Sequence, residues 1–475
     1  MKLHTQKWAL TILTMLNVLP TALRADSYAH SIFVPRQLAY NPIYENALVF
    51  DEYAHIDQFL ISIKPIYTQT VGDSIKEYFN INHACSMSVK EDGSGDLDSL
   101  WFQVISAPNS FYSSTLSFKP TQKTYGALIY CAWLLPADFA LTLNTAAIER
   151  KNNMHLCEKV TSTPNMGEVP GLTTMKQALA NPALNYGKVC GTQSESGFDD
   201  VQIKLLKNFR ACDDNSLFGD IYALVGIPTG SGSKSAYLFE PLVGSNHAQF
   251  GLGLNAEKSF DLCMCDQFSL YGEFKWRYGF KSTEVRSFDM TPNGQWSRYM
   301  LFTTPTDPNT PFPAINKLTF NAEVTPRNAF DVLLGAHLEV NKFVFELGYN
   351  FWYRQAEKVC PCINLAEVGI ADLVGIAQLN STNPVTVTSA SKATISEGVY
   401  PNEYQMPRDT TYTVVNKANI NSWSGAQAVA MTNAVYGSIG YHCGQLDLGI
   451  NASYEGGNSN TASVVSVWGN IDVRF

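Results

Sequence analysis

The chain has 475 residues and a net charge of −9; charged residues make up 16% of it and aromatic residues 12%. Binding of nucleic acid needs a basic surface, so this acidic balance excludes nucleic acid as a partner. Soluble proteins usually contain about 25% charged residues, well above the fraction found here. No run of about 18 apolar residues follows the N-terminal stretch, so a transmembrane helix is not predicted.

Residues 1–25 have the features of a secretory signal peptide. Lys2 and Lys7 come first, and the apolar stretch Trp8–Leu19 follows them, a short distance before Ala25. This order of a basic region, an apolar region and a small residue predicts export and cleavage after Ala25; an ordinary N-terminal helix is the alternative. Residues 26–58 have no clear period, and we expect them to form a periplasmic lead or a plug folded into a lumen.

Alternation of apolar and polar residues is clearest in Phe268–Thr283. Successive side chains point to opposite faces of a strand, so Phe274 and Trp276 share one face while Glu273 and Lys275 share the other. A strand that spans a membrane needs about 9–11 residues, apolar toward lipid and polar toward the lumen. Similar patterns along the chain predict about fourteen strands, at residues 59–70, 97–106, 112–119, 125–134, 139–149, 198–210, 217–227, 248–260, 268–283, 330–340, 343–354, 432–442, 446–454 and 463–475.

The connections between these predicted strands alternate between short and long. When they are counted from the C-terminus, one set has six residues or fewer, and the other set includes the long outer loops 150–197, 285–327 and 355–431. Short turns on one side, long loops on the other and an even strand count are typical of transmembrane barrels. The sequence therefore predicts an all-β, closed antiparallel transmembrane β-barrel at residues 59–475. A soluble all-β secreted protein is the alternative, because core-facing and lipid-facing alternation look alike.

The last residues also alternate and end in phenylalanine, reading Val467-Trp-Gly469-Asn-Ile471-Asp-Val473-Arg-Phe475. This stretch resembles the terminal strand of bacterial outer-membrane proteins. The resemblance implies a Gram-negative outer-membrane location, membrane lipid as a partner, and recognition of Gly469–Phe475 by the outer-membrane assembly machinery; a homo-oligomer is compatible with it. The strand number, the N-terminal plug and the long outer loops further resemble the fatty-acid and aromatic-compound uptake barrels.

Charged and polar side chains on the lumen-facing side of the strands are the candidate functional residues. Such groups are costly in lipid and must face water or one another. They line either a pore that selects solutes or a salt-bridged plug of side chains that closes the lumen. By strand parity the predicted pore-lining residues are Lys204, Arg210, Asp220, Glu257, Glu273, Lys275, Arg277, Lys281, His337, Glu339, Glu346 and Arg354.

These patterns predict an outer-membrane channel or porin for passive passage or uptake of small solutes through a charged lumen. The alternative is a surface-exposed structural or adhesin-type barrel that has a closed lumen and binds through its long outer loops. No nucleophile elbow, HExxH motif or phosphate-binding loop occurs, so we expect no enzyme, no catalytic residue, no metal and no cofactor. The ten cysteines of an exported chain predict disulfides within the loops of each side.

Overall fold

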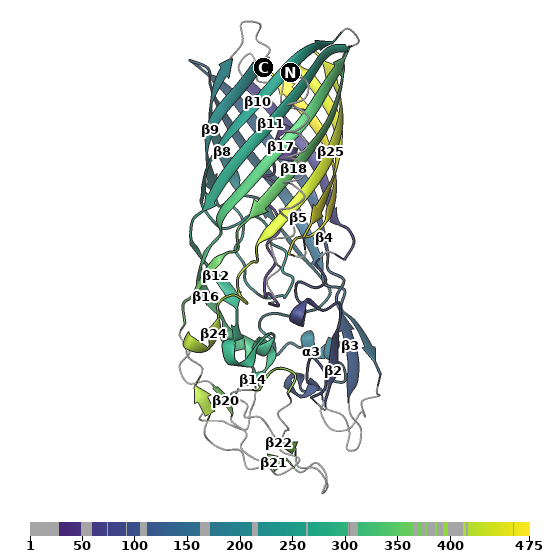
Figure 1. The fold of residues 1–475 in the computed structure, drawn as a ribbon, viewed down its shortest axis with the longest axis vertical. Coiled ribbons are helices and arrows are strands. Elements are labelled where there is room, and N and C mark those ends of the chain that lie inside the picture. The colour runs from purple at the N-terminus through teal and green to yellow at the C-terminus, as the bar shows by residue number, and fades with distance from the viewer. Residues whose placement is uncertain are drawn as a thin grey trace, which may run out of the picture.

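The computed structural model describes residues 28–48, 59–73, 75–91, 93–104, 112–161, 172–210, 217–262, 265–302, 304, 312–363, 369–371, 376–377, 385–386, 393–397, 412–414, 417–458 and 460–475. Its largest sheet has 13 strands, and all of them except β7 (Thr192–Phe198) form a closed antiparallel ring (Figure 1). In chain order the ring strands are β1 (Phe59–Thr70), β4 (Thr121–Leu135), β5 (Phe139–Asn153), β8 (Val201–Arg210), β9 (Leu217–Ile227), β10 (Gln249–Leu262), β11 (Cys265–Gly279), β17 (Arg327–Val340), β18 (Phe343–Arg354), β25 (Ala430–Cys443), β26 (Leu446–Gly457) and β27 (Val464–Arg474).

The ring closes where the first strand meets the last. β1 pairs with β27 on one side, with Ile63 opposite Ile471, and with β4 on the other, with Ile63 opposite Ile129. β5 is longer than its neighbour β8, so its residues 139–144 pair with β8 and its residues 147–153 pair with β7. Every ring strand therefore has two partners, and the barrel has no open edge that would leave backbone groups unpaired in lipid.

The described barrel has fewer strands than the sequence predicted, because residues 97–104 and 112–119 contribute none; residues 105 and 106 of the predicted strand 97–106 lie outside the described residues. Ser99–Phe102 forms the 3-10 helix η3, which begins at Asp98 and carries three consecutive large apolar side chains rather than alternating ones. Ser113–Ser117 is strand β3, which pairs with β2 (Met87–Lys90) and β6 (Cys157–Val160) in a small sheet outside the barrel. Short alternation suits any half-buried strand, so alternation at residues 112–119 did not distinguish this sheet from a barrel strand.

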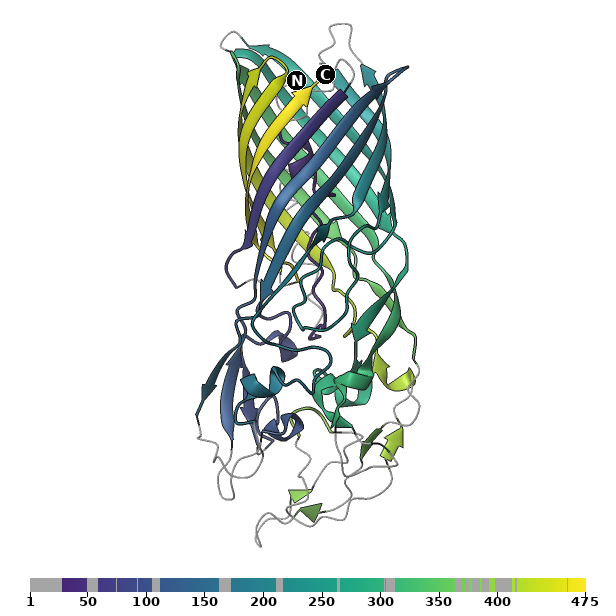
Figure 2. The same cartoon turned by 180° about the vertical axis from the view of Figure 1, so that it is seen from behind.

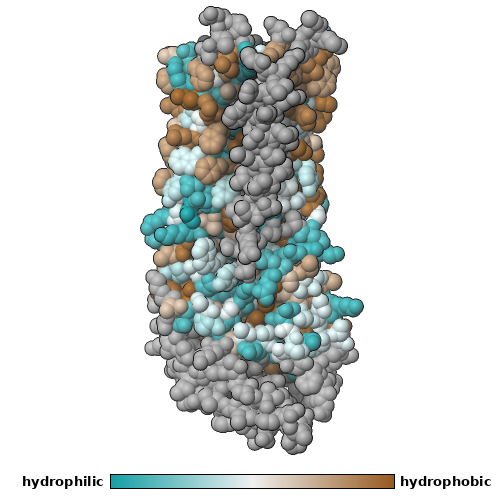
Figure 3. Space-filling view, viewed as in Figure 1, coloured by the Kyte–Doolittle hydropathy of each residue, from teal (hydrophilic) through white to brown (hydrophobic). Residues whose placement is uncertain are grey.

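The two faces of the barrel wall differ as the alternation predicts. In β11 the outward Phe274 is 47% exposed, whereas the neighbouring Glu273 and Lys275 are buried. The same holds for outward Leu254 of β10 and Leu347 of β18. Figure 3 shows apolar side chains gathered over the barrel and hydrophilic ones where the barrel meets the long connections. A closed barrel with an apolar exterior and a polar interior is built to stand in lipid. Among the described residues, no helix has the length and apolar character needed to cross a membrane.

The long connections all leave the same end of the barrel, which we call the outer end; at the other end, the inner end, every connection is short (Figure 1). At the outer end the connections form a region with its own hydrophobic core, which includes Phe79, Trp101, Phe118 and Trp296. Its described elements are β2, η3, β3, β6 and β7 together with η2 (Ile81–His83), α3 (Met175–Leu179), β12 (Ser282–Ser287), β13 (Asp289–Met290), η4 (Thr291–Asn293), η5 (Ser297–Tyr299), β14 (Leu301–Phe302), β15 (Phe312–Pro313), α4 (Ile315–Leu318), β16 (Thr319–Thr325), β19 (Lys358–Pro361), β20 (Gly369–Ala371), β21 (Ile376–Ala377), β22 (Val385–Thr386), β23 (Tyr412–Val414), η7 (Lys417–Asn419) and β24 (Ile420–Asn421).

Residues 28–48, which we call the lumen segment, run from the outer region into the barrel (Figures 1 and 2, dark purple). At its start, Ser31 donates to the carbonyl of Ser424 in the outer region. Its other end forms the short helix α2 (Pro42–Asn46), where the side chain of Asn41 accepts a hydrogen bond from the Ile43 amide at 3.1 Å. Proline at the first helical position and asparagine as the N-cap favour a helix start here.

Candidate functional site: the barrel lumen

Most of the predicted pore-lining residues are buried on the inner face of the wall. Glu339 is half-buried, and the side chain of Arg210 lies outside the described residues. Lys281 is different: it follows the end of β11, is exposed, and pairs with Glu323 of the outer region at 2.8 Å. The buried members are Lys204, Asp220, Glu257, Glu273, Lys275, Arg277, His337, Glu346 and Arg354.

A cluster of four buried charges holds helix α2. Glu45 of α2 forms ion pairs with Lys204 of β8 and with Lys275 of β11, the latter at 3.1 Å. Glu273 completes the cluster, with its carboxylate 3.5 Å from the Nζ atom of each lysine. The side chain of Asn46 also donates to Glu273 at 2.6 Å. Two carboxylates and two ammonium groups balance one another, so the buried charges are paired without solvent.

The end of α2 is bound to the wall by a second set of polar contacts. The ammonium of Lys64 on β1 donates to the carbonyls of Tyr44 and Glu45, at 2.9 and 3.1 Å. On β18, four strands along the ring from β1, the carboxylate of Glu346 accepts a hydrogen bond from the Leu48 amide at 2.9 Å. These contacts satisfy backbone groups that a short helix leaves without intrahelical partners.

Nearer the outer end, Arg36 links the lumen segment to two sides of the wall. Its guanidinium lies 2.5 Å from Asp331 of β17 and 3.3 Å from Glu455 of β26. Asp331 also pairs with Arg277 of β11 at 3.2 Å. The guanidinium of Arg36 also lies over the ring of Trp352, 5.2 Å from the ring centre. A planar, always charged group suits this position, since it can serve several acceptors and an aromatic face together.

Two adjacent carboxylates lie at the barrel rim, one bound to the middle of the lumen segment and the other to a neighbouring loop. Asp199 accepts hydrogen bonds from the amides of Leu38 and Ala39, at 2.9 and 3.2 Å. Asp200 accepts from the amide of Ser245 in the loop after β9. Burial raises the pKa of Asp199, and it raises the pKa of Asp200 to about 6, with the charge of Asp199 adding to the effect.

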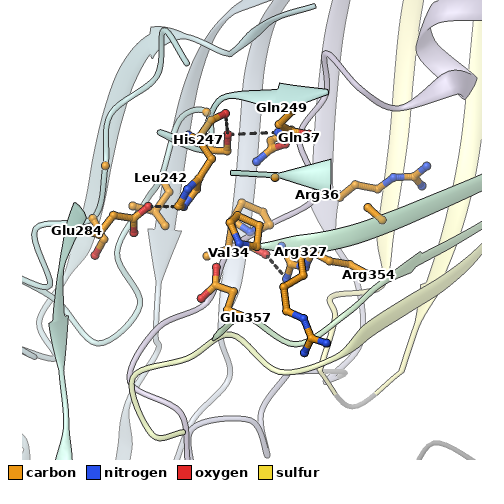
Figure 4. A pocket seen from close by; sticks show the side chains of 18 of the residues that line it. Val34, Arg36, Gln37, Leu242, His247, Gln249, Glu284, Arg327, Arg354 and Glu357 are labelled. Carbon is orange, nitrogen blue, oxygen red and sulfur yellow. Dashed lines mark hydrogen bonds and ion pairs between the residues drawn. The ribbon is translucent and has the colours of Figure 1, made fainter. Parts of the chain in front are cut away.

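Two cavities lie beside the lumen segment at the outer mouth of the barrel. The outer cavity is lined by Val34–Gln37 together with polar residues that include His247 and Glu284 (Figure 4). A second cavity is also lined by residues of the lumen segment, among them Arg36.

Strand parity identified the wall charges but could not identify their partners. Glu45 and Arg36 each form ion pairs with two wall charges, and they lie in a stretch without strand or long-helix periodicity. The sequence carried only a weak signal for these two partners. They are charged residues in a chain that has few of them, and they lie near the helix start at Asn41-Pro42. The alternation of neighbouring residues predicts which face of the wall a strand residue lies on. The position of a residue in the lumen segment depends instead on the closed barrel around it, which no local pattern reports.

The seven cysteines whose side chains the structure describes are free thiols, namely Cys85, Cys131, Cys157, Cys190, Cys360, Cys362 and Cys443. The side chains of Cys212, Cys263 and Cys265 lie outside the described residues. Disulfides within the loops therefore stay a prediction. Among the described residues, no group of three or more His, Cys, Asp or Glu side chains has the arrangement of a metal site.

The closed ring, the apolar exterior and the buried interior charges define a bacterial outer-membrane β-barrel. No protein-family model and no curated protein matches the chain. Similar solved structures include an outer-membrane channel from Pseudomonas putida F1, with 8% identity, 88% of this chain and 96% of that chain covered, and a TM-score of 0.40. The toluene transporter of Pseudomonas putida has 7% identity, coverage of 94% and 96%, and a TM-score of 0.30. The transport unit of the autotransporter AIDA-I from Escherichia coli has 8% identity, coverage of 91% and 96%, and a TM-score of 0.33.

Proposed function

We propose that the protein is a gated outer-membrane channel for small solutes, and that the described structure is its closed state. The observation that carries this proposal is that the lumen segment lies inside the barrel, where it is bound to the wall and lines both cavities. A barrel wider than eight strands has more interior than its own side chains fill. Here the lumen segment occupies that interior, and its described contacts are hydrogen bonds, ion pairs and packing, all of which are reversible.

Opening would require the lumen segment to move away from one side of the wall. The link made by Arg36 to Asp331 and Glu455 lies beside both cavities, so its release would join them. Passage of solutes would then be passive, through a lumen whose wall carries both signs of charge. A water-filled path lined in this way selects solutes by size and charge.

Ion conductance in planar bilayers tests the proposal, with wild type compared with Arg36→Gln. We expect rare, brief openings of wild type and an open probability at least tenfold higher for Arg36→Gln, because a buried Glu455 loses its charged partner. Lys281→Gln serves as the control, since it removes an equal charge at an exposed position. If folded, heat-modifiable barrels of both wild type and Arg36→Gln give no conductance steps, the channel proposal is wrong.

A surface-binding barrel with a permanently closed lumen is the second candidate. The observation that favours it is the outer region, whose long connections pack around a hydrophobic core of their own. Such a folded region offers a rigid surface beyond the membrane, where loops carry binding functions. Absence of conductance from both proteins in the test above would support this function over the channel.

A further inference from the structure

The outer cavity is lined by more cationic than anionic side chains. Five arginines line it, among them Arg277 and Arg286, but its carboxylates are only Glu284 and Glu357 among the described residues. Both carboxylates are used by Arg286, at 2.7 and 3.2 Å. Arg277 is also paired, with Asp331 behind the cavity wall. The charges that remain in this cavity are therefore positive.

Arg354, at the end of β18, lines the outer cavity (Figure 4), and it is the buried cation there that forms no ion pair with a carboxylate of the described residues. It is 8% exposed, and among the described residues it forms no ion pair. Its guanidinium donates one long hydrogen bond, to the carbonyl of Val34 at 3.4 Å, and its Nε atom has no partner among those residues. The nearby Glu357 is committed to Arg286 and to the amide of Gln427, at 3.2 and 2.9 Å. A buried guanidinium without an anion is costly, which indicates that an anion completes it.

Apolar groups lie beside this cation. The ring centre of Trp352 is 5.5 Å from the guanidinium carbon of Arg354 and lines the same cavity, together with Val34, Pro35 and Ala329. A cavity with one guanidinium that forms no ion pair and with an aromatic wall suits a ligand that has a charged end and an apolar body. A guanidinium fork matches a carboxylate, since two parallel N–H groups can meet its two oxygens.

We propose that the outer cavity binds small organic carboxylates, with Arg354 holding the carboxylate and Trp352 contacting the apolar body. This site deepens the proposed function, because it names the class of solute that the channel would admit. Binding of a carboxylate in the cavity does not require conduction through the barrel. An experiment can therefore contradict the proposed site without contradicting the proposed channel, and the reverse.

Titration calorimetry of the folded, detergent-solubilised protein with benzoate tests the site. We expect wild type to bind benzoate, to bind benzyl alcohol at least tenfold more weakly, and to bind inorganic phosphate more weakly than benzoate because phosphate has no apolar body. Arg354→Gln should lower benzoate affinity by about tenfold or more, since a charge-assisted pair is lost. Lys281→Gln, outside the cavity, should bind as wild type does.

The folding state of each variant is checked by heat-modifiable gel mobility, and Arg354→Lys provides a second variant that keeps the charge. We expect Arg354→Lys to retain part of the affinity, because it keeps the cation but loses the fork. Absence of benzoate binding to wild type, equal affinity of folded Arg354→Gln, or equal affinity for benzyl alcohol would each overturn the proposal. Tighter binding of phosphate than of benzoate would replace it with a simple oxyanion site. Conductance without benzoate binding would leave the channel standing and remove only the site.

Discussion

Leu48, at the end of the lumen segment, packs directly against the backbone of Gly449 on β26. A methyl group added at Gly449 would overlap the Cδ1 atom of Leu48, whereas the nearest other atom is the Ile439 carbonyl oxygen at 3.4 Å. The glycine therefore provides the space into which the lumen segment fits. The same relationship recurs nearer the outer end, where Tyr40 lies against Gly226 of β9.

Substitution Gly449→Ala should weaken the seating of the lumen segment by about 1 kcal/mol, because Leu48 must leave its place. In planar bilayers this corresponds to roughly a fivefold rise in open probability. Gly437→Ala is the matched control, since its nearest neighbour would be the Glu346 carbonyl oxygen at an ordinary 3.6 Å. The effect of Gly449→Ala should vanish in a Leu48→Ala background; an unchanged effect there would contradict the contact.

Substitution Glu45→Gln should release helix α2 from the wall. It leaves Lys204 and Lys275 buried with Glu273 alone, and breaking a buried ion pair from one side costs about 3–5 kcal/mol. Trypsin cleavage after Arg36, which is protected when the lumen segment is bound, measures the release. Glu323→Gln, in an exposed ion pair, should leave cleavage as slow as in wild type. Equal protection of Glu45→Gln would show that the charge cluster does not hold the segment.

Acid should loosen the start of the lumen segment through His30. Burial of the ring, which stacks on Tyr78, lowers the pKa of His30 to about 4, and the hydrogen bond to the Ala426 carbonyl only partly offsets this effect. The ordinary value is near 6.5, so the unfolded segment binds the proton first and stability falls as pH drops from about 6.5 to about 4, by roughly 3 kcal/mol in total. Hydrogen exchange of residues 29–33 at pH 7.5 and 4.5 measures this loss.

The comparison that isolates His30 uses two substitutions to glutamine. His30→Gln should remove most of the acid sensitivity of the segment, while His155→Gln, at an exposed position, should retain it. If His30→Gln and wild type lose protection equally on acidification, another group is responsible. Asp200 acts with the opposite sign: its pKa is raised to about 6, so its protonation favours the folded state as pH falls.

A charge on the lipid-facing side should impair insertion of the barrel. Leu254 on β10 is 45% exposed on the apolar exterior, and we expect Leu254→Arg to cost about 2–4 kcal/mol of folding into vesicles. Val160→Arg is the control, because Val160 is similarly exposed but lies in β6 of the outer sheet. Urea-dependent refolding into vesicles measures both. Equal costs would contradict the assignment of the exterior of β10 to lipid.

The barrel strands could be predicted because membrane strands carry a long repeat. In β11 the alternation continues over residues 267–279, and it fixes which side faces lipid. The same rule failed at Ser113–Ser117, where five alternating residues belong to a small sheet of the outer region. The rule also does not apply at Lys281, because this residue follows the end of β11, and alternation predicts a lumen-facing side chain only within a barrel strand.

The partners of the wall charges could not be predicted, because they come from far along the chain. Arg36 meets Asp331 and Glu455 only after the ring has closed, so no local pattern links them. Parity identified Arg354 as a lumen-facing residue but not as the one without a carboxylate. That property depends on Glu357 being taken by Arg286, which is a matter of packing rather than of sequence spacing.

The pairing of β1 with β27 has a consequence for the order of assembly. The lumen segment contacts the outer region at one end, while β1, which follows it in the chain, starts at the inner end of the wall. Once β1 and β27 have paired, the lumen segment can enter only by threading lengthwise through a closed ring. If instead the seam between first and last strands forms late, the sheet can curl around a segment already laid along it. The last backbone pairing would then also be the step that encloses the segment.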